Sequence, residues 1–208
     1  MSDTYQITSH EALTALQGEP GKLAANKVIK GLDPLCEAYL AATPFVVLST
    51  SNSNGDCDSS PRGDAPGFIY VQDENTLYIP ERPGNKRMDS LHNILDNPHI
   101  GMLCMIPGLN ETLRINGSAA LTTDPSILEK MEANGKLPKL AIKITVKECY
   151  IHCAKAFIRS HLWKPESWQE KSELPVPAKM IAAHVKLPNV DEASVVSSLN
   201  ESYSKRLY

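Results

Sequence analysis

The 208-residue chain lacks an excess of charge of either sign. Its 21 Lys and Arg residues stand against 24 Asp and Glu residues, which gives a formal net charge of −3. Proteins that coat nucleic acid or an anionic membrane carry a broad positive surface. We therefore expect neither a nucleic-acid partner nor a membrane partner, and any anion-binding site must be local.

Long apolar runs, a secretion signal and a cysteine framework are also missing. The longest apolar stretch, IGMLCMIP, is far too short to cross a bilayer. The opening stretch MSDTYQITSHEAL lacks the basic flank and apolar core of a leader. The five cysteines are odd in number and show no framework spacing, which favours reduced thiols in the core. These absences predict a cytoplasmic protein.

The sequence is rich in short segments typical of β-strands. A length of 208 residues with 42% hydrophobic content favours a single domain, 1–208, with one core. Strands are expected at 44–51, 59–67, 67–72, 76–80, 99–107, 111–123 and 141–153. Asn54 and Gly55 predict a tight hairpin turn, and Pro61 suits an edge strand. Because antiparallel hairpins dominate, we expect a mainly β fold: a six- to seven-stranded, closed or partly open barrel over 44–153.

Helices are expected before and after the barrel. The N-terminal segment, 1–43, contains two candidate helices at 19–31 and 33–43, the second with Asp33 as N-cap and Pro34 at its first position. The C-terminal tail, 154–208, reads as helix and Pro-rich loop.

Two further helices are expected between strands. One follows a Pro-Gly bend at 83–84 and ends at Asn97-Pro98, with one apolar face formed by Met88, Leu91, Ile94 and Leu95. The other spans about 125–134 and has Asp124 as its cap.

The segment ERPGNKRMDSL places the cations Arg82, Lys86 and Arg87 around that bend. We expect Lys86 and Arg87 in the first turn of the helix, where free N–H groups already carry partial positive charge. A bound phosphate would neutralise this end, with Asn85 as a cap or donor. The alternative is a solvated surface cluster that binds nothing.

Arg62 stands near the end of a predicted strand and could reach the same rim as the turn after Ile79 and Pro80. The alternative for Arg62 is an exposed charge on an edge strand. These residues therefore form one candidate anion site.

The order of these elements resembles a known family. A strand hairpin with an arginine, then LYIPERPGNKRMDSLHNILDNPHIGMLCMIPG, then ETLRINGSA, is similar to the pyridoxamine 5′-phosphate oxidase-like family of FMN-binding split barrels. The resemblance covers about residues 40–168. It is strongest to a branch of FMN-dependent enzymes that shares RPGNKR, the ETLRI segment and HCAKA.

The resemblance implies a Greek-key split barrel that forms a homodimer, with FMN at the subunit interface. Cations of one subunit would hold the FMN phosphate, and both chains would touch the ring. The cofactor contacts implied on this sequence are Arg62, Ile79, Pro80, Asn85, Lys86, Arg87, Thr112 and Arg114. The last two would meet the ring or ribityl chain across the dimer. Their alternatives are an ordinary strand threonine and a rim salt bridge.

The C-terminal region departs from the vitamin-forming oxidases. Their substrate-binding Arg and His pattern is absent, and HCAKAFIRSHLWKPESW stands in its place, which disfavours pyridoxamine 5′-phosphate oxidation. Lys155 and Arg159 share a helix face and could bind a small anionic substrate, with Trp163 as a lid. The alternative is a solvated basic face with an aromatic anchor. On the opposite face we expect four residues toward the core: Ala154, Phe157, Ile158 and Leu162.

The sequence thus predicts an FMN-dependent oxidoreductase that acts on a small molecule by hydride transfer through flavin N5. Two alternatives stay open: a flavin-binding or carrier protein without turnover, and a barrel that binds haem or another planar ligand. No metal site is expected, because Cys149, His152 and Cys153 lack a second ligand pair. No residue stands out as a catalytic acid or base.

Overall fold

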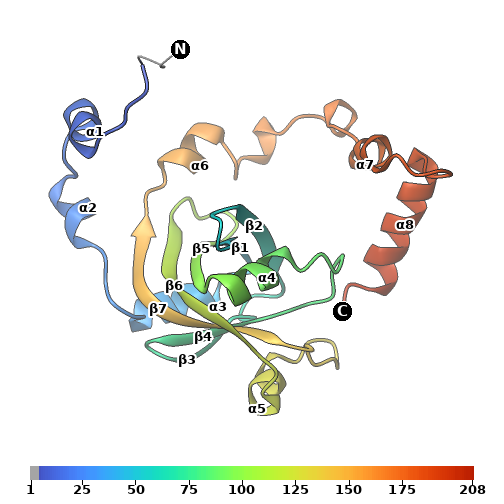
Figure 1. Cartoon of the computed structure of the whole chain (residues 1–208), viewed down its shortest axis with the longest axis horizontal. Coiled ribbons are helices and arrows are strands. Elements are labelled where there is room, and N and C mark those ends of the chain that lie inside the picture. The colour runs from blue at the N-terminus through green and yellow to red at the C-terminus, as the bar shows by residue number, and fades with distance from the viewer. Residues whose placement is uncertain (1–4) are drawn as a thin grey trace.

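The fold is a seven-stranded antiparallel sheet that curls on itself, with helices at both ends of the chain (Figure 1). The computed structural model describes residues 5–208. The sheet order is β2-β1-β5-β6-β7-β4-β3. The strands are β1 (Phe45–Ser51), β2 (Cys57–Gly63), β3 (Tyr70–Asp73), β4 (Thr76–Pro80), β5 (His99–Met105), β6 (Thr112–Thr122) and β7 (Ala141–His152). The predicted antiparallel split barrel is confirmed, with seven strands.

The first hairpin forms as predicted, but its turn is longer. The last pair of the ladder is Ser51 with Cys57, so residues 52–56 form the loop. The Asn52 side chain accepts hydrogen bonds from the backbone N–H groups of Asn54 and Asp56, and Gly55 adopts a positive φ of 88°. Pro61 lies in β2 at the edge of the sheet, where its missing N–H costs no ladder bond.

The N-terminal helices differ in part from the prediction. Helix α3 (Pro34–Ala41) is confirmed, and the Asp33 carboxylate accepts the Cys36 N–H at 2.8 Å. Helix α2 (Lys22–Asn26) is shorter than the predicted 19–31, because Ile29 exchanges two backbone hydrogen bonds with Cys149 of β7 and is therefore extended. Helix α1 (His10–Gln17) was not predicted, and neither α1 nor α2 contains a buried residue.

Helix α4 (Asp89–Asp96) packs against β1, β2 and β6. The predicted apolar face is only half correct. Leu91 and Ile94 are buried, whereas Met88 and Leu95 are exposed. Met88 precedes the helix with a left-handed φ of 60°, so it does not share the helical face.

The helix after β6 also ends earlier than predicted. It consists of α5 (Pro125–Leu128) and the 3-10 turn η1 (Glu129–Met131), with Asp124 capping as expected. Beyond it, Ala133 and Lys136 exchange two backbone hydrogen bonds around a turn, which replaces the last expected helical residues.

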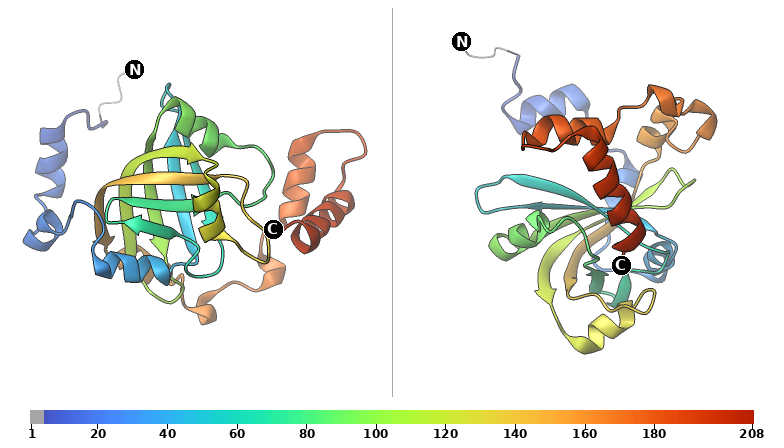
Figure 2. Two further views of the ribbon diagram at one scale, coloured as in Figure 1. Left: turned by 90° about the horizontal axis from the view of Figure 1, so that it is seen from below. Right: turned by 90° about the vertical axis from the view of Figure 1, so that its right-hand side faces the viewer.

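The C-terminal tail runs as an arc beside the barrel (Figures 1 and 2). Helices α7 and α8 pack on each other. In the helices and 3-10 turns of the tail, only Ala178 and Val195 are buried. The elements are α6 (Lys155–Ser160), η2 (Pro165–Ser167), η3 (Lys171–Glu173), α7 (Pro177–Val185) and α8 (Glu192–Lys205). Within residues 5–208, no helix combines the length and the apolar character needed to cross a membrane.

The core fills the inside of the curled sheet and is closed by α3 and α4. Cys36, Cys104 and Cys149 are buried in it, and all five cysteines of the chain are free. Burial raises the pKa of the Cys104 thiol to about 12, so this thiol is protonated and unreactive near neutral pH.

A β-bulge in the β6–β7 ladder sets which residues of β7 face outward. The register passes from Asn116–Glu148 to Gly117–Val146 and skips Lys147. The skipped residue reverses the alternation of β7. As a result Cys149 points into the core, while Tyr150 and other alternate residues lie on the outer face.

Gly117 is required at this bulge. A Cβ atom there would lie 2.1 Å from the backbone carbonyl oxygen of Thr145, a distance that no side chain can occupy without moving backbone. We expect Gly117→Ala to lower the free energy of unfolding by about 3 kcal/mol, measured by urea denaturation. Gly21→Ala is the matched control, since a Cβ at Gly21 meets no atom within 4 Å. Equal stability of the two variants would contradict this account of the bulge.

Candidate functional site

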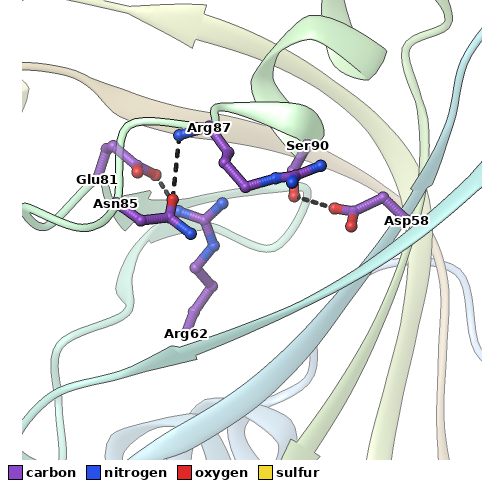
Figure 3. A network of polar contacts seen from close by, with 6 residues as sticks. All are labelled: Asp58, Arg62, Glu81, Asn85, Arg87 and Ser90. Atoms are coloured by element: carbon purple, nitrogen blue, oxygen red, sulfur yellow. Dashed lines mark hydrogen bonds and ion pairs between the residues drawn. The ribbon is translucent and has the colours of Figure 1, made fainter. Parts of the chain in front are cut away.

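The polar residues of β2 lie on the inner side of the sheet, beneath the loop 81–88 and the start of α4 (Figure 3). Arg62 pairs across the ladder with Val46, and Asp58 pairs with Thr50. Val46 and Thr50 are both buried, and directly paired residues point to the same face. Arg62 therefore points into the open end of the barrel and is not an exposed edge charge.

Arg62 is nearly buried and carries its own counter-ion. Its guanidinium forms an ion pair with Glu81, the first residue of the loop. Its Nε atom is buried and has no hydrogen-bond partner. A buried donor without a partner is costly, so this N–H is a free hydrogen-bonding group at the mouth of the barrel.

The loop holds its cations in a turn and not in a helix. Asn85 accepts the backbone N–H of Arg87 at 3.0 Å through its side-chain oxygen. Lys86 has a left-handed φ of 62°, and α4 begins only at Asp89. The expectation that Lys86 and Arg87 lie in the first helical turn is therefore wrong, because left-handed residues at 86 and 88 interrupt helical geometry.

Arg87 reaches along the surface to the helix start. Its Nε donates to Asp89 at 2.7 Å, and the side chains of this pair are 73% and 46% exposed. Exposed pairs of this kind contribute little to stability. Arg87 is therefore available to another anion.

Ser90 and Asp58 fix the helix to β2. The Ser90 hydroxyl donates to Asp58 at 2.6 Å, and Ser90 itself is buried. Figure 3 shows this pair beside the Arg87 side chain. Neither residue stands out in the sequence as a site residue. The only signal for Asp58 was its place in alternation with Ser60 and Arg62 on one face of the strand.

Arg82 belongs to a second cluster. It donates to Asp64 at 2.7 Å, and the Asp64 side chain is only 3% exposed. Tyr208 donates its hydroxyl to the other oxygen of Asp64 at 2.6 Å, and its ring lies 5.7 Å from the Arg82 guanidinium carbon. Lys136 donates to the Tyr208 carbonyl at 2.8 Å. Arg82 thus forms an ion pair with Asp64, the residue that follows β2. Through Tyr208, this pair holds the C-terminal tail against the barrel.

This cluster stabilises the ionised form of Asp64. Burial alone would raise its pKa, but hydrogen bonds from Tyr208, the backbone N–H of Ala65 and Arg82 together lower the pKa of Asp64 below its ordinary value of 3.8. Asp64 is therefore a full negative charge near neutral pH.

Other predicted cofactor residues occupy two different places. Ile79 and Pro80 are buried in β4, and Ile79 packs in the core, so its side chain is closed to a ligand. Thr112 and Arg114 alternate with Leu113 and lie on the outward side of β6, but Thr112 is only 1% exposed, so within one chain Arg114 alone is accessible there. One chain therefore does not bring Thr112 and Arg114 together with Arg62. No rim salt bridge of Arg114 occurs within residues 5–208; its guanidinium lies over the Tyr150 ring.

The predicted substrate residues on α6 are exposed. Lys155 and Arg159 form no ion pair among residues 5–208. Trp163 donates to the Leu109 carbonyl at 2.9 Å and stacks on Phe157 with ring centroids 5.7 Å apart. The expected core face of this helix is wrong: none of its residues is buried, and Ile158 and Leu162 are exposed. The aromatic pair instead anchors the tail to the loop between β5 and β6.

The model of the family described as "Pyridoxamine 5'-phosphate oxidase" matches residues 32–153, which is more than half of the chain. The chain therefore belongs to the pyridoxamine 5′-phosphate oxidase family. No curated protein matches it significantly.

Several solved structures are similar to the barrel. HupZ of Group A Streptococcus is 16% identical, with 58% of this chain and 93% of that chain covered and a TM-score of 0.47. An FMN-binding protein from Syntrophomonas wolfei is 11% identical, with 56% and 80% covered and a TM-score of 0.43. HutZ, the haem storage protein from Vibrio cholerae, is 12% identical, with 58% and 94% covered and a TM-score of 0.43.

In the part of the chain from residue 5 onward, no group of three or more His, Cys, Asp or Glu residues is arranged to hold a metal ion. His152 and Cys149 lie on opposite faces of β7, since Cys149 is buried in the core.

The Tyr208 contact yields a test of how the tail is held. Tyr208→Phe removes the hydroxyl that binds Asp64, and we expect the docking equilibrium of the tail to weaken by about tenfold. Limited proteolysis of residues 154–208 should become correspondingly faster. Tyr203→Phe is the control, because Tyr203 is 65% exposed.

The same contact has a defined pH dependence. Because the pKa of Asp64 is lowered in the folded protein, its contribution is present above 3.8 and is lost as the pH falls through the lowered value. If the rate of tail proteolysis were the same in the wild-type protein and in Tyr208→Phe, and did not change as the pH is lowered, the docking of the tail on Asp64 would be contradicted.

Proposed function

We propose that this protein is an FMN-dependent oxidoreductase that acts on a small molecule as a homodimer. The observation that carries the proposal is the loop 81–88 folded over Arg62, whose buried Nε has no partner, in a chain of the pyridoxamine 5′-phosphate oxidase family. FMN, when bound, supplies a ring that can accept or donate a hydride. The residues described below bind and orient it.

The loop residues fit a phosphate dianion. Lys86 has no ion-pair partner among residues 5–208, and Arg87 holds only the exposed carboxylate of Asp89. A phosphate oxygen forms stronger charge-assisted bonds with Arg and Lys than an exposed side-chain pair does. Exchange of Asp89 for phosphate at Arg87 is therefore favourable. Arg62 can keep its ion pair with Glu81 and at the same time donate a hydrogen bond from its Nε–H group to the phosphate.

The position of Thr112 and Arg114 supports a dimer. Both residues lie on the outward side of β6, where Arg114 is half-buried and Thr112 is covered, while Arg62 points into the barrel. A single ligand can meet both sets only if the outer face of one subunit lies against the phosphate loop of the other. This is the arrangement that we propose for the homodimer.

The phosphate assignment is tested by flavin affinity. We expect Lys86→Ala with Arg87→Ala to weaken FMN binding by about 100-fold, because two charge-assisted bonds are lost. Asp89→Asn should act in the opposite direction, since it frees Arg87 from its competing carboxylate. The matched control is Lys155→Ala with Arg159→Ala, which removes the same charge from α6. Isothermal titration with FMN is carried out on the apo forms of the wild-type protein and of these three variants. Unchanged FMN affinity in the Lys86→Ala, Arg87→Ala variant would refute the site.

The dimer is tested by sedimentation. FMN-loaded protein should sediment as a dimer in analytical ultracentrifugation, and Arg114→Glu should weaken both dimerisation and FMN binding because it places a negative charge at the shared surface. A monomer that retains FMN would overturn the interface.

Turnover separates an enzyme from a carrier. A ligand released by heat and identified by mass spectrometry distinguishes flavin from haem. Repeated cycles of flavin bleaching and reoxidation with one substrate would establish an oxidoreductase, whereas stable binding without any cycle would favour a carrier.

A further inference from the structure

A cluster of positive charge lies on the outer face of the sheet, away from the phosphate loop. Arg114 of β6 pairs across the ladder with Tyr150 of β7, and the Arg114 guanidinium carbon is 5.4 Å from the centre of the Tyr150 ring. Lys27 places its Nζ 5.5 Å from the same ring centre. All three side chains are half-buried. Two cations therefore share one aromatic platform.

The fold positions both cations firmly. The bulge that skips Lys147 turns Tyr150 to the outer face, opposite Arg114. Ile29 exchanges backbone hydrogen bonds with Cys149 at 3.0 and 2.9 Å, which holds the segment containing Lys27 along β7. Arg114 is fixed by the strand ladder, and Lys27 lies in the segment between α2 and Ile29, two residues before this bridge to β7.

His152 completes the cluster. It pairs across the ladder with Thr112, the next outward position beside Arg114, and so adjoins the proposed flavin contact. Its Nδ1 atom is buried and has no hydrogen-bond partner. Burial, Arg114 and Lys27 all lower the pKa of His152, so it is neutral near neutral pH and can present one N–H group.

Within residues 5–208, neither Lys27 nor Arg114 forms an ion pair. Glu148 lies on the same face and is hydrogen-bonded by Asn116 at 2.6 Å, but it forms no ion pair with either cation. This differs from the phosphate loop, where each arginine has an acidic partner. Two like charges beside one ring repel each other, and a bound anion would offset that repulsion.

We propose that Lys27, Arg114 and His152 form the binding site for the anionic group of the substrate, a carboxylate or a phosphate, with Tyr150 as its platform. The proposal rests on the oxidoreductase function proposed above. It names the substrate class as a small molecule with one anionic group held beside the flavin ring. The exposed pair Lys155 and Arg159 is not part of this site.

Anion binding to the full-length apoprotein tests the site. Inorganic phosphate and succinate are titrated separately by calorimetry, which distinguishes the two anion classes. We expect saturable binding of at least one of them, weakened about tenfold or more by Arg114→Gln and by Lys27→Gln. Lys155→Gln with Arg159→Gln should leave the affinity within about twofold, since it removes exposed charge from a different element.

The His152 ring resonance provides a second readout that a folding defect cannot imitate. Saturating anion should raise the pKa of His152 in the wild-type protein, because a nearby negative charge stabilises imidazolium. In Arg114→Gln the anion should cause no such rise. Absence of saturable binding in the wild-type protein, or equal affinity in Arg114→Gln and the α6 control, would overturn the site.

The two proposals fail separately. If the wild-type protein binds FMN but shows no saturable anion binding, the substrate assignment is wrong and the flavin site stands. Anion binding that survives in a protein unable to bind FMN would refute the oxidoreductase and keep the cluster as an anion site. Competition between FMN and the anion whose binding depends on Arg114 would also overturn the substrate assignment, because the cluster would then hold the cofactor.

Discussion

The backbone ladder between β6 and β7 is the constraint on which the remaining structure depends. It is the longest pairing in the sheet, and its single bulge is possible only because Gly117 lets the Thr145 carbonyl approach so closely. Before the bulge, β7 presents alternate residues such as Ile142 and Ile144 to the core. After it, the alternation is reversed, and Tyr150 and His152 face outward. One extra residue thus decides whether a cationic surface exists at all.

Charge compensation divides the basic residues of the chain into two kinds. Arg62, Arg82 and Arg87 each hold a carboxylate, and the burial of each pair decides how easily it is exchanged. Arg82 and Asp64 are structural because both are shielded and Tyr208 adds a third contact. Arg87 and Asp89 lie in water and separate at little cost. Around Tyr150, by contrast, neither Lys27 nor Arg114 forms an ion pair within residues 5–208, which is why the two regions suit different ligands.

Much of the fold could be predicted from local chemistry. Asp33 followed by Pro34 predicted a helix start, and the β-branched segments predicted the strands, because these signals act over a few residues. The left-handed Lys86 and Met88 gave no such signal, since neither residue type favours that conformation. The bulge at Gly117 depends on a partner strand, and the contact of Tyr208 with Asp64 joins residues 144 apart. Contacts between residues far apart in the chain produce no local sequence pattern. The sequence therefore identifies the cations but not the carboxylates that pair with them.

The docked Tyr208 makes the C-terminal tail a closed loop whose intermediate portion barely touches the barrel. The entropy cost of closing such a loop grows slowly with its length, by about 0.6 kcal/mol for each doubling. Insertions or deletions between α6 and α8 should consequently be tolerated during evolution, whereas Tyr208 and the buried Asp64 must change together. The length of the segment between α6 and α8 can therefore vary, while the Tyr208–Asp64 contact stays the same.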